Sequence, residues 1–439
     1  MKRLINSYLQ LWKRDSYRKP LLLRGARQVG KTYEVRQFGK TYQHFVEINF
    51  EKSPEMRAVF DQDLQPKRIL RDLIILLGRS IDPVNTLLFF DEIQTAPRAL
   101  LALRYFYEEM PSLHLIAAGS LIDFTTEEVG IPVGRVTSLY MYPLSFIEFL
   151  DAVSEEILVQ EITKFDPSQA FSELVHQKLL RLLGEYIAIG GMPEAVYKWQ
   201  QTKDMALCQQ VHNALVDTYR QDFNRYANKF QMKYVKLLFD HIPLLLGQKF
   251  KFSAVPGEYR KRELSPCLDL LTTAGIAHKV FQSDAHGAPL GAQADPDDFK
   301  IIFLDIALSQ AILGLNSGEW IVNPLQQFIN KGGLVEALIG QELLAYADPF
   351  KKEQLYYWHR TSKNSQAEVD YVVQKDGAII PIEVKSGEGS TLKSMHIFLE
   401  SHPQSICGVR FSTQNVSFYQ NIYSYPLYAI ARFAKGDLL

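Results

Sequence analysis

Residues 25–32 combine glycine, lysine and threonine at a spacing that suits one kind of chemistry. They follow three leucines and fit G-x-x-x-x-G-K-[ST] without a mismatch, as Gly25, Ala26, Arg27, Gln28, Val29, Gly30, Lys31 and Thr32. The two glycines let the backbone curl, so that successive N–H groups point into a phosphate-sized concavity. The lysine would reach the β- and γ-phosphates of a nucleotide, and the threonine hydroxyl would bind Mg²⁺. The segment predicts a nucleotide-phosphate site; the alternative is a glycine-rich structural turn.

An acidic pair follows a second apolar run further along the chain. Residues 86–92, Thr-Leu-Leu-Phe-Phe-Asp-Glu, are typical of a buried parallel strand that ends in two carboxylates. Asp91 can hold Mg²⁺ through water, while Glu92 can polarise an attacking water. Joined to the phosphate site, the pair predicts hydrolysis. On its own it could merely cap the next helix.

Two further polar residues are candidates for contact with the nucleotide. Ser120 lies at the small polar end of another buried strand, residues 113–120, where a γ-phosphate sensor would lie; a helix cap is the alternative. Arg135 follows Gly134 in a loop and could act as an arginine finger, within the chain or across an oligomer interface. A surface arginine without a role is the alternative for Arg135.

A second cluster of charged residues is predicted near the C-terminus. Residues 368–387 hold two β-rich runs around Asp376-Gly377, a dipeptide that favours a type I′ hairpin turn. A two-residue turn there would place Asp370 opposite Glu383 and Glu368 opposite Lys385. Facing carboxylates need a cation or a shared proton, which Mg²⁺ or Mn²⁺ would supply. Lys385 could orient a water or steady phosphate charge; it could also simply pair with Glu368.

Between these clusters lies a strongly basic stretch. Residues 220–262 carry ten basic and three acidic side chains, a local charge of +7 in a chain of net charge −1. Apolar periodicity predicts helices over 233–246 and 264–274, followed by strands over 277–281 and 299–304. Two helices and a two-stranded wing could lay a helix in a DNA groove while the basic residues neutralise phosphates. The alternative is a helical lid whose lysines are solvated.

Composition limits the class of protein. The 439 residues are 47% apolar and 22% charged, which excludes a disordered or collagen-like chain, and the near-zero net charge excludes a global basic field. Three cysteines far apart argue against a disulfide framework and for a reducing compartment. With no apolar run of membrane-spanning length and no signal-peptide core, a cytoplasmic location without a membrane partner is expected.

The order of several motifs resembles one large family of proteins. The motifs are RGARQVGKT, LLFFDEIQ, LIAAGS, GRV, YPLSFIEFL and IGGMPEAV. Together they resemble bacterial and archaeal AAA-type (AAA+) P-loop ATPases that carry a C-terminal domain of unknown function. The resemblance implies ATP as the nucleotide, an α/β P-loop domain over about residues 1–200 and a winged-helix-like middle region. Ser120 is a departure, since typical ring-forming AAA+ machines carry asparagine there.

The C-terminal array of Asp370, Glu383 and Lys385 resembles the motif of the PD-(D/E)XK restriction-endonuclease-like superfamily. In that superfamily a glutamate from a preceding helix often joins the metal site. Residues 333–347 look helical and offer Glu336 and Glu342. The ATPase family resembled here has a glutamate near Glu336, which therefore is the preferred third metal ligand.

These observations predict an α/β protein of three domains: a P-loop NTPase (AAA+-like) domain over 1–200, a helical and winged-helix-like domain over 201–330, and an α/β restriction-endonuclease-like domain over 331–439. The predicted function is Mg²⁺-dependent ATP hydrolysis coupled to a metal-dependent, nuclease-like domain acting on nucleic acid, DNA rather than RNA. The alternative is an ATP-gated switch that binds DNA or protein and whose nuclease-like domain is inactive. A homo-oligomer is compatible with these observations.

Overall fold

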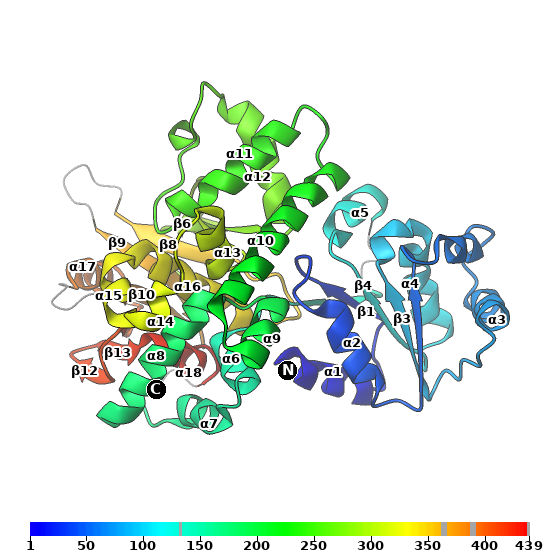
Figure 1. Cartoon of the computed structure of the whole chain (residues 1–439), viewed down its shortest axis with the longest axis horizontal. Coiled ribbons are helices and arrows are strands. Elements are labelled where there is room, and N and C mark those ends of the chain that lie inside the picture. Colours follow the sequence, from blue (N-terminus) through cyan, green and yellow to red (C-terminus); the bar gives the residue numbers. More distant parts are fainter. Residues whose placement is uncertain (131–133, 361–366, 387–391, 437–439) are drawn as a thin grey trace.

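A computed structural model describes the chain except residues 131–133, 361–366, 387–391 and 437–439, and the side chains of 126–129. The chain is mixed α/β, as predicted. Figure 1 shows a first body, coloured blue to cyan, beside a larger one built of green helices and a yellow-to-red sheet. The N-terminus lies where the two bodies meet.

The first body is built on five parallel strands in the order β2-β3-β4-β1-β5. Their bounds are β1 Leu21–Arg24, β2 His44–Asn49, β3 Thr86–Asp91, β4 His114–Ala118 and β5 Thr137–Tyr140. Every residue of β1, β3 and β4 is buried, since helices cover both faces of a parallel sheet, and this explains their continuous apolar runs. The helices of this body are α1 Ile5–Arg14, α2 Lys31–Gly39, α3 Pro66–Leu77, α4 Pro97–Glu109 and α5 Ile122–Val129.

Helices dominate the middle of the chain. They are α6 Phe146–Ala152, α7 Glu156–Lys164, α8 Glu173–Ile189, α9 Pro193–Thr202, α10 Met205–Asp222, α11 Met232–His241, α12 Lys261–Thr273, α13 Ile306–Ile312, α14 Glu319–Val322 and α15 Pro324–Asn330. The helix predicted over 233–246 appears as α11 and a following 3₁₀ turn, Ile242–Leu245; the one predicted over 264–274 appears as α12.

The second sheet has eight strands in the order β12-β13-β11-β10-β9-β8-β6-β7. The strands are β6 Ala277–Ser283, β7 Ala294–Phe303, β8 Leu355–His359, β9 Glu368–Lys375, β10 Ala378–Lys385, β11 Gly408–Ser412, β12 Ser417–Tyr419 and β13 Ile422–Pro426. Three helices complete this part: α16 Gly332–Tyr346, α17 Lys393–Ser401 and α18 Ile430–Lys435.

The predicted strand pair of the middle region forms, but not as a free wing. β6 and β7 pair antiparallel as a hairpin, and β6 also pairs parallel with β8. The hairpin is therefore an edge of the C-terminal sheet. The physical reason lies in β7, whose residues 299–303 are all buried, whereas a wing in solvent would leave one face exposed.

The predicted hairpin of the C-terminal sheet has the expected turn and register. Asp376 and Gly377 both have positive φ, 49° and 79°, the backbone that a type I′ turn requires. Lys375 pairs with Ala378, and Tyr371 with Ile382. The same register carries Asp370 to the position beside Glu383.

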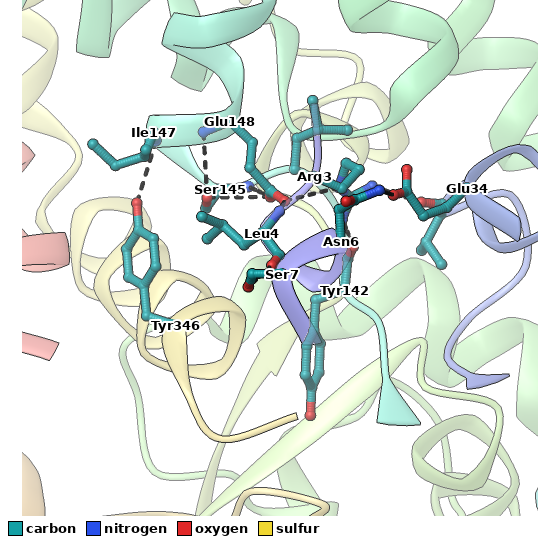
Figure 2. Close-up of polar contacts among 12 residues, drawn as sticks. Arg3, Leu4, Asn6, Ser7, Glu34, Tyr142, Ser145, Ile147, Glu148 and Tyr346 are labelled. Atoms are coloured by element: carbon teal, nitrogen blue, oxygen red, sulfur yellow. Dashed lines mark hydrogen bonds and ion pairs between the residues drawn. The ribbon is translucent and has the colours of Figure 1, made fainter. Parts of the chain in front are cut away.

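Two charged side chains, distant in sequence, are buried together where the two bodies meet (Figure 2). Arg3 Nε donates to Glu148 Oε1 at 2.9 Å, and each side chain is only 6% exposed. The same guanidinium donates to the carbonyls of Val29 and Tyr142 at 2.9 and 2.6 Å. Glu148 also accepts the backbone N–H of Ser145, which caps α6. The pair thus ties α1 to the phosphate segment and to α6.

Substitution of Glu148 by alanine should destabilise the protein by about 3–5 kcal/mol, because it leaves the Arg3 guanidinium buried without its counter-charge. Asp151→Ala is the matched control, since Asp151 lies on the same helix and pairs with exposed Lys2 at 3.0 Å. The control should change stability little. Urea unfolding followed by circular dichroism measures both; equal losses for the two variants would contradict the role given to the buried pair.

Candidate functional site

The backbone of the predicted phosphate segment turns so tightly that only glycine fits its first position. Gly25 has φ +141°, and a Cβ there would lie 2.1 Å from the carbonyl oxygen of Met141. β1 ends at the residue before, and α2 begins at Lys31. The N-terminus of α2, with its positive dipole end, therefore faces the concavity of the loop.

Donors from the rest of the protein hold the carbonyl groups of this loop. Lys31 Nζ donates to the carbonyls of Gly25 and Ala26 at 2.8 and 2.7 Å. The Tyr219 hydroxyl on α10 donates to the Arg27 carbonyl at 2.5 Å, in addition to the contact of Arg3 with Val29. Among the described residues, the loop N–H groups of residues 26–30 donate no hydrogen bond. Since these N–H groups have no acceptor within the described part of the chain, they are free to donate to a phosphate group.

Lys31 is buried at the centre of this arrangement. Burial lowers the pKa of its ammonium to about 8, and the carboxylates of Glu92 and Asp91 oppose that shift. A polyanion in the loop would add further negative charge next to the ammonium and so favour its charged form.

The residues predicted to hold Mg²⁺ beside the loop lie together. Thr32 Oγ1 donates to Asp91 Oδ1 at 3.0 Å, and Asn49 Nδ2 donates to Asp91 Oδ2 at 2.8 Å. Burial, followed by repulsion from Glu92, raises the pKa of Asp91. A hydroxyl and a carboxylate oxygen are donors that suit Mg²⁺, which would neutralise phosphate charge there. The Gln94 amide donates to the Glu92 carboxylate and fixes its position.

Ser120 lies near the phosphate loop, whereas Arg135 does not. Ser120 follows β4, which pairs with both β1 and β3, and it lines a pocket together with Gly25 and Ala26. Arg135 precedes Thr137, which pairs with Leu21 at the opposite end of β1. About six residues of strand, roughly 20 Å, therefore separate Arg135 from the loop within one chain.

Instead, Arg135 Nε donates to Glu108 at 2.8 Å on the exposed surface. This position is contrary to an arginine finger acting within the chain. A contact across an oligomer interface stays a prediction.

The structure brings Glu336, Asp370, Glu383 and Lys385 into one cluster at the second sheet. Glu336 extends from α16, Asp370 from β9, and the other two from β10. The Lys385 ammonium contacts Glu383, not Glu368 across the hairpin. Burial and the neighbouring charge of Asp370 raise the pKa of Glu383 to about 7. Glu342, the other glutamate considered, lies elsewhere and accepts the Phe146 backbone N–H.

Sequence reasoning missed the residue at the centre of this cluster. Lys300 of β7 places its Nζ 2.8 Å from Glu336 Oε1, 2.6 Å from Glu368 Oε1 and 3.8 Å from Asp370 Oδ1. Burial lowers the pKa of Lys300, but the three carboxylates together raise it above the usual value. A lysine inside the apolar run Phe-Lys-Ile-Ile-Phe-Leu was the available signal, since lysine is rarely buried unless paired.

The predicted metal ligands of this second cluster do not fit a divalent cation as they are arranged. Lysine ammonium groups already contact them, and Asp370 Oδ2 accepts the Val384 backbone N–H at 2.7 Å. Within the part of the chain that the structure describes, no three carboxylate, histidine or cysteine side chains are placed to hold a metal ion.

Carboxylates neutralise only part of the positive charge of residues 220–262. Carboxylates pair with Arg220, Arg225, Lys249 and Lys261. Six other basic residues are exposed and, among described residues, have no carboxylate within ion-pair distance; they are Lys229, Lys233, Lys236, Lys251, Arg260 and Arg262. They lie on or next to α11 and α12.

Residues 17–150 match the family model described as an AAA domain. The first body is an AAA-type P-loop domain. Residues 180–319 and 331–430 match two further models, described as domains of unknown function DUF8612 and DUF4143. The AAA match ends at residue 150, within α6, and the β6–β7 hairpin that carries Lys300 falls in the second matched segment.

Similar proteins are distant. An uncharacterized protein of Methanocaldococcus jannaschii is 28% identical over 165 residues, which are 37% of this chain and 35% of that protein, so the match spans about a third of the relative's length. The Walker-type ATPase of Pyrococcus abyssi aligns with a TM-score of 0.41 at 15% identity, over 67% of this chain and 91% of that one. Drosophila ORC bound to DNA aligns with a TM-score of 0.27 at 14% identity, over 70% and 84%.

The helices give one further observation. None of those formed by the described residues combines the length and the apolar character needed to span a bilayer.

Proposed function

We propose that the protein is an ATP-hydrolysing switch in which the nucleotide held by the P-loop domain controls the C-terminal sheet. The observation that carries this proposal is the position of the β6–β7 hairpin. Gly275 just before β6 and Leu304 just after β7 line one pocket with Gly25 and Ala26 of the phosphate loop. The strands between them belong to the eight-stranded sheet.

In the proposed reaction, residues of the loop and of the ends of the neighbouring strands have different roles. The loop N–H groups and the Lys31 ammonium bind the phosphates, while Thr32 and Asp91 are the residues that would hold Mg²⁺. Glu92 would accept a proton from the attacking water, and Ser120 would sense the terminal phosphate. Mg²⁺, when bound, supplies charge neutralisation at the phosphates.

A second contact supports coupling through the same hairpin. Asp305, two residues beyond β7, accepts the Gly191 backbone N–H at 2.7 Å and caps α13. Pro193, two residues from Gly191, packs at the phosphate loop, where a Cβ on Gly30 would lie 3.3 Å from its ring. The end of the hairpin beyond β7 is thus linked to the loop that would hold the phosphates of the nucleotide.

Nucleic acid is the proposed partner, DNA in preference to RNA. The support is the set of six exposed, unpaired basic residues around α11 and α12, together with exposed Phe230, whose side chain is 86% accessible. Basic side chains that release counterions from phosphates give affinity without sequence readout.

A metal-dependent nuclease is the second candidate function. It is favoured by the convergence of Glu336, Asp370, Glu383 and Lys385 and by their resemblance to the PD-(D/E)XK motif. The contacts of Lys300 count against it, which makes the switch the preferred account.

The switch requires that Glu92→Gln lower ATP hydrolysis at least about 100-fold while ATP still binds, because only the general base is lost. Glu109→Gln, an exposed change on α4, is the control and should leave the rate unchanged. Phosphate release and nucleotide binding are measured on the same preparations. Full ATPase activity of Glu92→Gln would show that Glu92 is not the general base.

The triple change Lys229→Ala, Lys236→Ala and Lys251→Ala should weaken DNA binding and flatten its salt dependence, because fewer counterions are released. Lys52→Ala, Lys67→Ala and Lys164→Ala together remove the same charge from exposed sites elsewhere and should not. Fluorescence anisotropy with ATP analogue or ADP gives the affinities. Equal affinities in both nucleotide states would argue against the switch.

The same mixtures, incubated with Mg²⁺ or Mn²⁺, decide between the two candidates. Cleavage by the native protein that Asp370→Ala abolishes would establish the nuclease. If Lys31→Ala also abolishes the cleavage, ATP licenses it.

A further inference from the structure

We propose that Lys300 is a built-in counter-ion: its ammonium takes the place of a divalent cation among Glu336, Glu368 and Asp370, so that the folded C-terminal cluster binds no divalent metal. This inference concerns the C-terminal cluster alone. It does not depend on ATP hydrolysis or on any nucleic-acid partner.

The geometry of the ammonium resembles that of a bound ion. The Lys300 side chain is 3% exposed, and its Nζ lies 2.8 and 2.6 Å from oxygens of Glu336 and Glu368, with Asp370 Oδ1 at 3.8 Å. The ring of Tyr357 lies on another side, 5.1 Å from Nζ to its centroid. A buried charge is tolerated only when it is paired and hydrogen-bonded, and these contacts meet that condition.

A further oxygen of the cluster is also engaged, since Asp370 Oδ2 accepts the Val384 backbone N–H at 2.7 Å. Mg²⁺ and Mn²⁺ prefer several oxygens and waters around one centre. With Lys300 in place, the carboxylates of Glu336 and Asp370 surround an ammonium instead.

The charges of the cluster predict the effect of removing the Lys300 ammonium. Four carboxylates, those of Glu336, Glu368, Asp370 and Glu383, lie with two lysines, Lys300 and Lys385. Glu383 Oε2 is buried and lacks a hydrogen-bond partner among the described residues. Without the Lys300 ammonium, the carboxylates would repel one another, and a divalent cation would relieve that repulsion.

The test is Mn²⁺ binding by the full-length protein without nucleotide, followed by electron paramagnetic resonance. Mn²⁺ binding by the cluster is defined as the binding that is lost in Asp370→Asn. The native protein should show no such binding. Lys300→Met should gain one site that binds Mn²⁺ at least about tenfold more tightly than any site of the native protein. Lys300→Arg keeps the positive charge and should gain none. Lys279→Met, which removes a lysine of β6 paired with exposed Asp269, is the matched control.

Thermal unfolding gives a second readout. Lys300→Met should be destabilised in metal-free buffer and recover part of its melting temperature in Mn²⁺, while the native protein gains nothing at this cluster. If that variant does not fold, Lys300→Met with Glu368→Gln lowers the excess charge and takes its place. Native Mn²⁺ binding that Asp370→Asn abolishes would overturn the proposal. A folded Lys300 variant that gains no Mn²⁺ would overturn it as well.

Discussion

A buried ammonium needs carboxylates around it, and the ion pairs of Lys300 decide how the second half of the chain is assembled. Lys300 lies on β7, Glu336 on α16, and Glu368 and Asp370 on β9. These pairs connect the β6–β7 hairpin, which precedes α16 in the sequence, to α16 and to β9. Separation of the hairpin from the sheet would expose apolar β7 and leave the carboxylates of Glu336, Glu368 and Asp370 without their shared cation. The middle region and the C-terminal strands therefore form one sheet.

In the phosphate loop, too, buried polar groups are paired, but here it is the carbonyl groups that have partners and the N–H groups that have none among the described residues. Lys31, Arg3 and Tyr219 occupy its carbonyls, while its N–H groups stay available. One polar cluster is thus built to receive an anion, and the other already contains its cation. The hairpin connects them, because Leu304 borders the phosphate-loop pocket and Lys300 lies four residues away, about 13 Å along an extended strand.

Local patterns in the sequence predicted much of this structure. The phosphate loop, the acidic end of β3 and the turn at Asp376-Gly377 each depend on neighbours in sequence, and the turn fixed the register that brings Asp370 beside Glu383. The burial of Arg3 with Glu148 and the docking of Lys300 depend on contacts between distant segments; the apolar run around Lys300 indicates that this lysine is buried, but not which carboxylates pair with it. For Arg135, the local sequence suggested a finger within the chain or across an oligomer interface, and the register of β5 places it at the other end of the sheet from the loop, so that the interface alone stays a prediction.

The central claim is that the nucleotide bound by the phosphate loop alters the hairpin that carries Lys300. Amide hydrogen exchange across β6 and β7, in the presence of ADP or of a non-hydrolysable ATP analogue, tests it most directly. Exchange rates in residues 276–304 should differ at least several-fold between the two nucleotides in the native protein and should not differ in Lys31→Ala. Identical exchange in both states of the native protein, with both nucleotides shown to be bound, would contradict it.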